Sequence, residues 1–405
     1  MAGATVAGVV AYAGALGALC WISLLLRAAR HIGTVPRIKD QPSDLPGPAW
    51  PSLAVVFAAR DEEAGVERAV RSLLAQDYPD LRVVAVDDRS TDRTGALLDT
   101  LAVADSRLRV IHICTLPAGW LGKTHALQVG AEAADAEWLL FTDADVIFSP
   151  GSLRRAVGLA VRQQHTDLLV VAPDMVTETF AERVFLAFFL LLLAINSPPW
   201  LVTDRRSKAA VGAGAFDLVR AGAFRSVGGF ERIALSVDDD LRLGQVLKFA
   251  GYHVVLAMGQ DEVFVRWHVG LGGMIRGLEK NFFAALDFRP GQAVLVGLFL
   301  AWVGVLPWLG LVVGPWWTRL VCAGGIGAVA LSLSQARGQN GMAWYHGLFL
   351  PVGAVALMIA LYRSTWLTYR RGGVRWRGHL YPLPVLRDHV RRRNAWLREV
   401  WLSTR

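Results

Sequence analysis

The sequence predicts an α/β domain with a mostly parallel sheet, joined to apolar membrane helices at both ends of the chain. Two observations support this fold class. Hydrophobic residues make up 54% of the 405 residues and charged residues only 19%, which is too apolar for an ordinary soluble domain. Between residues 53 and 172, short apolar runs alternate with stretches of helical periodicity, as in strands that are linked by covering helices.

The first element is an uncharged segment, residues 1–26, which Arg27 and Arg30 follow. About 20 apolar residues span a bilayer, so we expect a transmembrane anchor over residues 1–30. Positive charge after the helix places the following residues in the cytoplasm. Residues 31–51 are expected to form a stiff linker, because prolines cluster there: Pro42, Pro46, Pro48 and Pro51.

Five short runs rich in Leu, Val and Ile are predicted to be strands: 53–58, 81–87, 108–113, 137–143 and 167–172. The stretch 66–74 has its apolar residues on one helical face and is predicted to be a covering helix. Ligands bind at the carboxyl ends of the strands in such sheets, and the polar clusters of this chain lie there. The domain is expected to extend over residues 52–289.

Two acidic motifs end predicted strands. Asp87 and Asp88 end the second strand, where adjacent carboxylates are unfavourable unless something binds. A carboxylate there can accept hydrogen bonds from a nucleotide base and ribose; the alternative is an ordinary capped turn. Asp143 and Asp145 end the fourth strand. Residues i and i+2 of an extended segment point to the same side, so this pair is expected to hold Mg²⁺ or Mn²⁺.

Lys123 follows Gly122 at the start of a predicted helix. A lysine in this position can meet a phosphate through its ammonium group and the helix N-terminus. The same residues resemble the end of a P-loop, so a membrane-attached P-loop NTPase is an alternative. The first glycine of that motif falls on Pro117, which lacks the N–H group that a phosphate cradle needs, and this disfavours the alternative.

A third acidic cluster, Asp238-Asp239-Asp240, precedes a predicted helix at 241–249. Successive carboxylates repel each other, and a partly buried one has a raised pKa, which a general base near a bound diphosphate can use. The alternative is a solvated acidic turn, because negative charge stabilises a helix N-terminus.

Further apolar segments follow. Residues 184–203 are uncharged, but Pro198 and Pro199 leave only about 12 strongly apolar residues, too few to span a bilayer. We expect this helix to lie on the membrane surface; the alternative is a buried core helix. Membrane segments are expected over 290–364, from three apolar runs: 290–318, 320–336 and 341–362.

Residues 365–405 are expected to be a basic tail. With the α/β domain inside, three crossings would leave this tail outside, against the positive-inside tendency. We therefore expect one segment to enter the membrane without crossing it. The candidates are 320–336, which is short and rich in glycine, and 290–318, which Pro307 bends. The net charge of +8 is taken to indicate contact with an anionic membrane surface. Nucleic acid is not an expected partner, because the domain has no basic patch interleaved with aromatic residues.

These motifs, in this order, resemble the inverting GT-A glycosyltransferases of family 2, from about residue 53 to residue 288. The similarity is greatest to the membrane-bound enzymes that glycosylate ceramides, carotenoid acids and hopanoids. The resemblance implies a GT-A fold, a nucleotide-sugar donor such as a UDP-sugar, and a divalent metal, Mn²⁺ or Mg²⁺. It also implies that the acceptor is a hydroxyl or carboxyl group of a membrane lipid. The chain is accordingly expected in the plasma or inner membrane, with its catalytic domain in the cytoplasm.

The resemblance implies a role for each acidic motif. Asp240 would be the catalytic base, with Asp239 beside it, and Asp145 would hold the metal together with Asp143. Contacts to the donor would come from four residues: Glu62, Asp88, Lys123 and Asp143.

The sequence departs from the family in its acceptor region. The Q-x-x-R-W motif of processive synthases is degraded, and only Arg276 remains of it. Arg276 and the nearby Trp267 are expected to bind substrate, although an interfacial aromatic anchor is an equal alternative for Trp267. The degraded motif disfavours a processive polysaccharide synthase, which is kept as the alternative function. A non-catalytic lipid carrier is disfavoured, because it has no use for carboxylates at strand ends.

Overall fold

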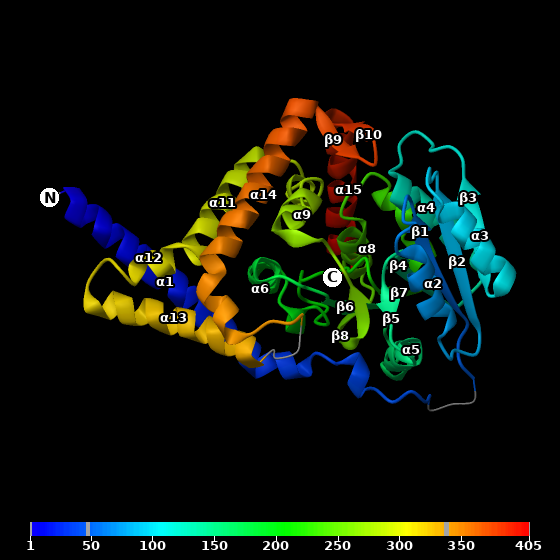
Figure 1. The fold of residues 1–405 in the computed structure, drawn as a ribbon, viewed down its shortest axis with the longest axis horizontal. Helices are drawn as coiled ribbons and strands as arrows, with labels where there is room; N and C mark the ends of the chain where they lie inside the picture. Colours follow the sequence, from blue (N-terminus) through cyan, green and yellow to red (C-terminus); the bar gives the residue numbers. More distant parts are fainter. Residues whose placement is uncertain (1, 46–48, 336–339, 405) are drawn as a thin grey trace. The chain divides into compact units, whose positions relative to one another are not determined.

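The computed structural model describes residues 2–45, 49–335 and 340–404 (Figure 1). Pro46 and Pro48 of the predicted linker lie outside the described residues. The chain divides into two compact units, which are described separately. The sheet unit comprises Val35–Met175, Leu201–Arg266 and Asp388–Arg405. The helical unit comprises Met1–Thr34, Val176–Trp200 and Trp267–Arg387.

A mixed sheet forms the centre of the sheet unit, with the order β3-β2-β1-β4-β7-β6-β8-β5 among the described residues. The strands are β1 (Leu53–Ala59), β2 (Leu81–Asp88), β3 (Leu108–Ile113), β4 (Trp138–Asp143), β5 (Ile147–Phe148), β6 (Leu168–Met175), β7 (Asp217–Arg220) and β8 (Val254–Val265). Strands β3, β2, β1 and β4 are parallel, and β7 runs antiparallel to β4 and β6. Strand β8 is parallel to β6. The predicted α/β fold with a mostly parallel sheet is confirmed.

Both faces of the sheet are covered, which explains why its strands read as continuous apolar runs. In β1, Val55 and Phe57 face one core and Ala54 and Val56 face the other. The first core is covered by α2 (Val66–Leu74), α3 (Thr94–Ala104) and α5 (Ser152–Arg162). The second is covered by α4 (Gly122–Ala133), α7 (Ala221–Ser226) and α8 (Asp239–Phe249).

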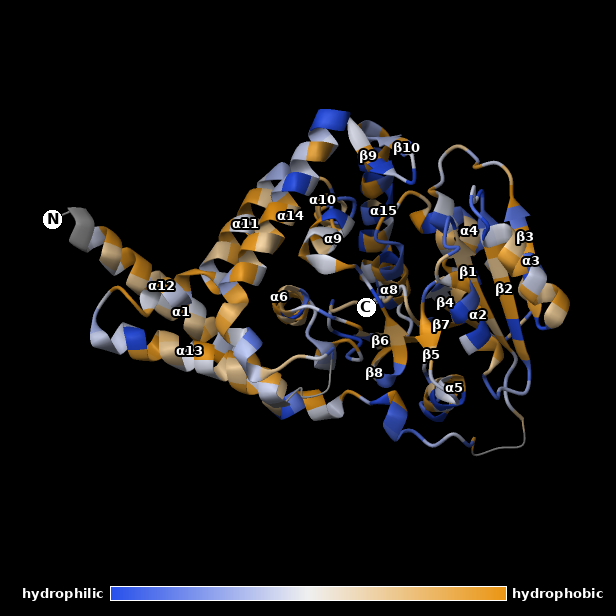
Figure 2. Ribbon diagram, in the orientation of Figure 1, coloured by the Kyte–Doolittle hydropathy of each residue, from blue (hydrophilic) through white to orange (hydrophobic). Residues whose placement is uncertain are grey.

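The helical unit contains most of the long apolar helices. They are α1 (Ala2–His31), α6 (Phe180–Asn196), α11 (Pro290–Gly304), α12 (Leu306–Gly310), α13 (Trp316–Gln335) and α14 (Leu350–Arg371). Short helices α9 (Gly270–Gly277) and α10 (Phe282–Ala285) precede α11. Hydrophobic colour runs along α11 and α14 in Figure 2. By length and composition, five segments of the described residues are candidate membrane spans: Thr5–Thr34, Phe180–Leu201, Pro290–Gly310, Trp316–Ser334 and Trp344–Arg371.

The prediction of one apolar segment over 290–318 is wrong in its boundaries. Helix α11 ends at Gly304, and Pro307 lies in the first turn of α12, because proline lacks the N–H group that would continue the helix. The next helix, α13, already begins at Trp316. Helix α6 is also longer than its strongly apolar stretch, since a capping box of Thr179 and Glu182 starts it early.

The C-terminal region is folded and is not an extended tail. A hairpin of β9 (Gly373–Trp376) and β10 (His379–Pro382) leads into α15 (Leu383–Ser403). From Asp388 onward, α15 belongs to the sheet unit. Leu397 is buried in the second core, and the Trp401 ring packs against Phe249 of α8.

Candidate active site

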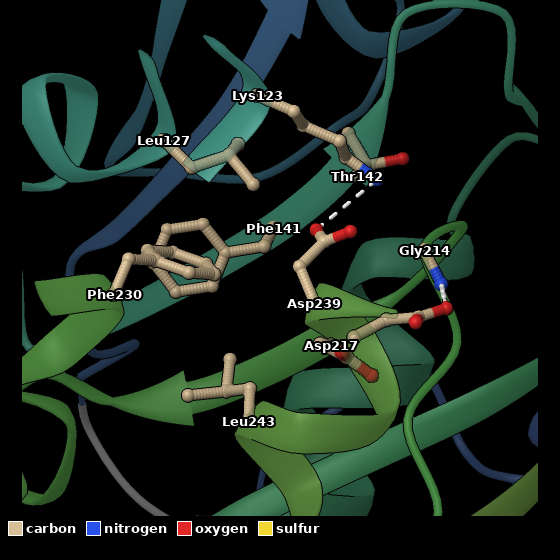
Figure 3. Close-up of a pocket in the computed structure, with 10 residues that line it drawn as sticks. Lys123, Leu127, Phe141, Thr142, Gly214, Asp217, Phe230, Asp239 and Leu243 are labelled. Atoms are coloured by element: carbon tan, nitrogen blue, oxygen red, sulfur yellow. Dashed lines mark hydrogen bonds and ion pairs between the residues drawn. The ribbon is translucent and has the colours of Figure 1, made fainter. Parts of the chain in front are cut away.

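Lys123 joins two acidic motifs at the carboxyl edge of the sheet. Its ammonium group lies 2.8 Å from Asp143 Oδ1 at the end of β4. The same group lies 3.2 Å from Asp239 Oδ2 at the start of α8, as the dashed line in Figure 3 marks. Burial disfavours the charged ammonium, but the carboxylates of Asp143, Asp239 and Asp240 hold the pKa of Lys123 well above its usual value. Lys123 is therefore a fixed positive charge between two predicted site motifs.

Asp240 is held by backbone groups. Its Oδ2 accepts a hydrogen bond of 2.8 Å from the N–H of Gly214, and its Oδ1 accepts one of 2.8 Å from the N–H of Leu241. Asp240 is half-buried and forms no ion pair with a described residue, whereas Asp239 is buried and paired with Lys123. Burial and the charge of Asp239 raise the pKa of Asp240 to about 6, as the sequence predicted for a partly buried member of this cluster.

The loop before β7 packs closely against Asp143 and Asp240. The sequence did not predict this contact. A Cβ at Gly212 would lie 1.9 Å from the carbonyl oxygen of Asp240, and one at Gly214 would lie 2.7 Å from Asp143 Oδ2. Only glycine fits at such close approaches. The small-residue run Val211-Gly212-Ala213-Gly214 was the available sequence signal.

Asp217, the first residue of β7, is a further carboxylate that sequence reasoning missed. It is buried, lines the same small cavity as Lys123 and Asp240 (Figure 3), and accepts a 3.0 Å hydrogen bond from the N–H of Ala213. Burial and the nearby charge of Asp240 raise the pKa of Asp217 well above its ordinary value. Burial therefore favours the protonated, neutral form of Asp217.

The geometric argument for the Asp143–Asp145 pair is wrong. Strand β4 ends at Asp143, and Ala144 and Asp145 form a turn, so the two carboxylates do not lie side by side along an extended segment. Asp143 pairs with Lys123. Asp145 is exposed at the surface, yet desolvation by the surrounding protein and the charges of Asp143 and Glu62 raise its pKa to about 6.

These carboxylates fit a divalent cation only in part. Within the described ranges, no group of three or more His, Cys, Asp or Glu side chains is placed to hold a metal ion. The mutual repulsion that raises the pKa of Asp145 is nevertheless relieved by a cation. Mg²⁺ is typically bound by one or two carboxylates together with substrate phosphates, so this arrangement fits a metal that binds with a phosphate ligand.

Asp88 lies close to the start of α4. It is buried, and its two oxygens accept hydrogen bonds of 2.8 and 3.0 Å from the guanidinium group of Arg89. A Cβ at Gly122 would lie 2.2 Å from Asp88 Oδ2, so this glycine permits the close packing.

Helix α15 contacts Ser236, which immediately precedes the acidic turn Val237–Asp240. Arg393, which is buried, donates a 3.2 Å hydrogen bond to Ser236 Oγ, and His389 Nε2 lies 3.4 Å from the same oxygen. Burial and the charges of Arg393 and Arg392 lower the pKa of His389 to about 4, so this imidazole is neutral. The predicted basic tail thus contributes residues to the site region.

The two remaining predicted residues, Trp267 and Arg276, belong to the helical unit. The Trp267 ring stacks on Phe189 of α6, with 5.0 Å between centroids. Arg276 is exposed at the end of α9 and lines a cavity of that unit. The structure thus brings together Lys123, Asp143, Asp239 and Asp240.

Comparison with known proteins defines the class. A solved mannosyltransferase of Pyrobaculum calidifontis, in complex with GDP-Man and Mn²⁺, aligns with a TM-score of 0.50 and 17% identity, over 89% of this chain and 98% of that one. The sheet unit with its flanking helices therefore has the GT-A fold. A sequence profile described as Glycosyl transferase family 2 matches residues 54–209. Residues 54–209 therefore form a family 2 glycosyltransferase domain, and the enzyme class that they define is glycosyltransferase.

Two characterised relatives are similar to this chain in sequence. The 4,4'-diaponeurosporenoate glycosyltransferase of Staphylococcus haemolyticus is 23% identical over 64% of this chain and 67% of the relative. The beta-monoglucosyldiacylglycerol synthase of Synechocystis is 34% identical over 35% of this chain, and this match spans only 29% of that relative's length. The acidic turn of α8 lies beyond the residues that the family profile matches.

Proposed function

We propose that this enzyme transfers a sugar from a nucleotide-sugar, a UDP-sugar, to a hydroxyl or carboxyl group of a membrane lipid. The observation that carries the proposal is the meeting of Lys123, Asp143, Asp239 and Asp240 at the carboxyl edge of the sheet. The lipid acceptor is supported by the two relatives, which are named for lipid-type molecules. The apolar helices of the helical unit would bring the site to such an acceptor.

Asp240 would act as the general base. Its carboxylate accepts the proton of the acceptor group while the acceptor oxygen forms a bond to the anomeric carbon. The bond from that carbon to the diphosphate breaks, and the diphosphate leaves with the electron pair. One displacement inverts the anomeric centre. The N–H groups of Gly214 and Leu241 fix the orientation of the carboxylate and leave lone pairs on both oxygens for the incoming proton.

Lys123 would stabilise the charge that develops on the departing diphosphate. Its ammonium group is preorganised by Asp143 and Asp239, so little rearrangement is needed during the reaction. Asp239 would thus act through Lys123 and through its charge on Asp240, and not as the base.

Asp145, with Asp143 and Glu62 nearby, would hold a divalent metal when the donor diphosphate is present. A bound Mn²⁺ or Mg²⁺ supplies Lewis-acid stabilisation of the diphosphate oxygens. Glu62 and Asp88 would contact the nucleoside, at the ends of β1 and β2, and Arg89 would give way to it.

The connectivity of the sheet unit supports a cytoplasmic catalytic domain with an even number of crossings after it. Strand β6 precedes α6 and strand β7 follows it, yet the two strands are paired. Both ends of α6 would therefore lie on one side of the membrane. Helix α15 also returns to the sheet unit, so the three candidate spans after residue 289 would include one that does not cross. The broken segment of α11 and α12 fits that role.

The proposal is tested with the purified full chain in lipid nanodiscs, a panel of nucleotide-sugars, Mn²⁺ and an extract of membrane lipids. We expect one donor to give nucleoside diphosphate and a lipid carrying one sugar in equal amounts. Polymer of increasing length would instead indicate the processive synthase. Absence of sugar on lipid with every donor would overturn the proposal.

A further inference from the structure

A basic cavity lies in the helical unit, within residues that the proposed reaction does not use. It has a volume of about 190 Å³, several times the roughly 30 Å³ that one water molecule occupies in the liquid. Four segments line it: the end of α9, the residues that follow α9, the last turn of α14, and strand β9. Four of its lining residues are cationic: Arg276, Lys280, Arg371 and Arg375.

The positive charge of this cavity is largely uncompensated. Its acidic lining residue is Glu279, and that carboxylate is already paired with Arg363, which lies outside the lining. The backbone oxygen of Glu279 also accepts a 2.6 Å hydrogen bond from Ser364. Among the residues that the structure describes, Arg276, Arg371 and Arg375 have no carboxylate partner. Like charges gathered around a hollow repel each other unless an anion lies between them.

Aromatic residues place this cavity at the level of lipid headgroups. It lies at the C-terminal end of α14, which closes the candidate span Trp344–Arg371 and is hydrophilic at that end in Figure 2. The ring of Trp376 lines the cavity, and the ammonium of Lys280 lies 4.1 Å from its centroid. Tryptophan and clustered Arg and Lys at the end of a span are typical of the membrane interface.

We propose that this cavity binds the phosphate of an anionic membrane phospholipid. Guanidinium groups from two elements, Arg276 of α9 and Arg375 of β9, can donate several charge-assisted hydrogen bonds to the phosphate oxygens. The acyl chains would extend from this end of α14 into the membrane. The inference concerns a lipid other than the acceptor and does not depend on the proposed transfer reaction.

The test uses the full chain in a neutral detergent without donor or metal. Binding of dioctanoyl-phosphatidylglycerol is measured for the wild type, for Arg276→Gln with Arg375→Gln, and for a matched control, Arg370→Gln with Arg377→Gln. The control removes the same amount of charge, from the end of α14 and from the hairpin, but neither residue lines the cavity. Dioctanoyl-phosphatidylcholine and inorganic phosphate are the comparison ligands.

We expect saturable binding of phosphatidylglycerol that weakens about tenfold or more in the cavity variant and changes less than about twofold in the control. Arg276→Lys with Arg375→Lys keeps both charges and is expected to retain most of the binding, which excludes misfolding as the cause. Equal loss in the cavity and control variants would overturn the proposal, as would no loss in either. Inorganic phosphate or phosphatidylcholine binding as tightly as phosphatidylglycerol would also overturn it.

Discussion

Lys123 and Asp239 form an ion pair between the first turns of α4 and α8, with 3.2 Å between Nζ and Oδ2. The same ammonium group lies 2.8 Å from Asp143 at the end of β4. The ammonium group of Lys123 thus links α4, α8 and the central strand β4. This contact fixes the acidic turn that carries the proposed base against the edge of the sheet.

Replacement of Lys123 by Gln is expected to impair both stability and catalysis. Asp143 and Asp239 would then repel each other without compensation, and we expect the Tm to fall by about 5 °C. Loss of the ammonium from the diphosphate is expected to lower kcat by about 10²-fold or more. Lys123→Arg keeps the charge and is expected to restore the Tm more fully than kcat. Thermal unfolding and initial rates on the three proteins measure this, and a fully active Lys123→Gln enzyme would show that the lysine has only a structural role.

Metal binding is expected to depend on the donor. The carboxylates near Asp145 do not form a complete cation site among the described residues, so Mn²⁺ alone should bind weakly. Calorimetric titration with Mn²⁺, with and without the donor's nucleoside diphosphate, measures this. EDTA is expected to abolish sugar transfer, and Mn²⁺ or Mg²⁺ to restore it. Full transfer in EDTA would remove the proposed metal role of Asp143 and Asp145.

The rate should fall in acid because of Asp240. Its pKa is about 6, and a base must be ionised to accept a proton, so log kcat/KM is expected to decline as the pH drops below about 6. The charge of Asp239 helps to raise this pKa, so Asp239→Asn should move the acidic limb to lower pH. Burial favours the neutral form of Asp217, so Asp217→Asn is expected to keep the rate and the profile nearly unchanged. An acidic limb that is identical in wild type and Asp239→Asn would contradict the assignment to Asp240.

The membrane topology gives a prediction that does not require activity. The native Cys114 is exposed on the sheet unit, so it marks the side on which that unit lies. In a background with Cys20→Ser and Cys322→Ser, Ser207→Cys after α6 and a tag after α15 should be accessible from the same side as Cys114. We expect this side to be the cytoplasm. Labelling of Ser207→Cys from the opposite face would mean that α6 crosses and that the paired-strand argument fails.

The sequence predicts the parallel half of the sheet well, because those strands are buried on both faces and are therefore continuously apolar. Strand β7 was missed because it has only four residues and starts with Asp217. Strand β8 was missed because Gly259, Gln260 and Asp261 interrupt its apolar pattern. The helix 66–74 was predicted to the residue, since its apolar face matches the helical period.

The sequence indicates candidate site residues, which stay a prediction, but not how they are arranged. Polar side chains at strand ends mark an edge, yet the sequence does not show that Lys123 bridges Asp143 and Asp239, because these residues are far apart in the chain. The contacts of α15 with the site region could not be predicted for the same reason, because Arg393 and Ser236 are far apart in the chain. A basic C-terminal segment looks like a membrane-surface tail, whereas Arg393 is buried against Ser236.

The central claim is that Asp240 is the catalytic base, and kcat for Asp240→Asn beside Asp239→Asn tests it most directly. Asparagine keeps the size of the side chain and can still accept one of the two backbone hydrogen bonds, so donor Kd should change little. We predict that kcat of Asp240→Asn falls about 10²–10⁴-fold, and that Asp239→Asn, which acts through Lys123, loses less. If Asp240→Asn transfers sugar at nearly the wild-type rate while Asp239→Asn is inactive, the base is Asp239 and the account is wrong.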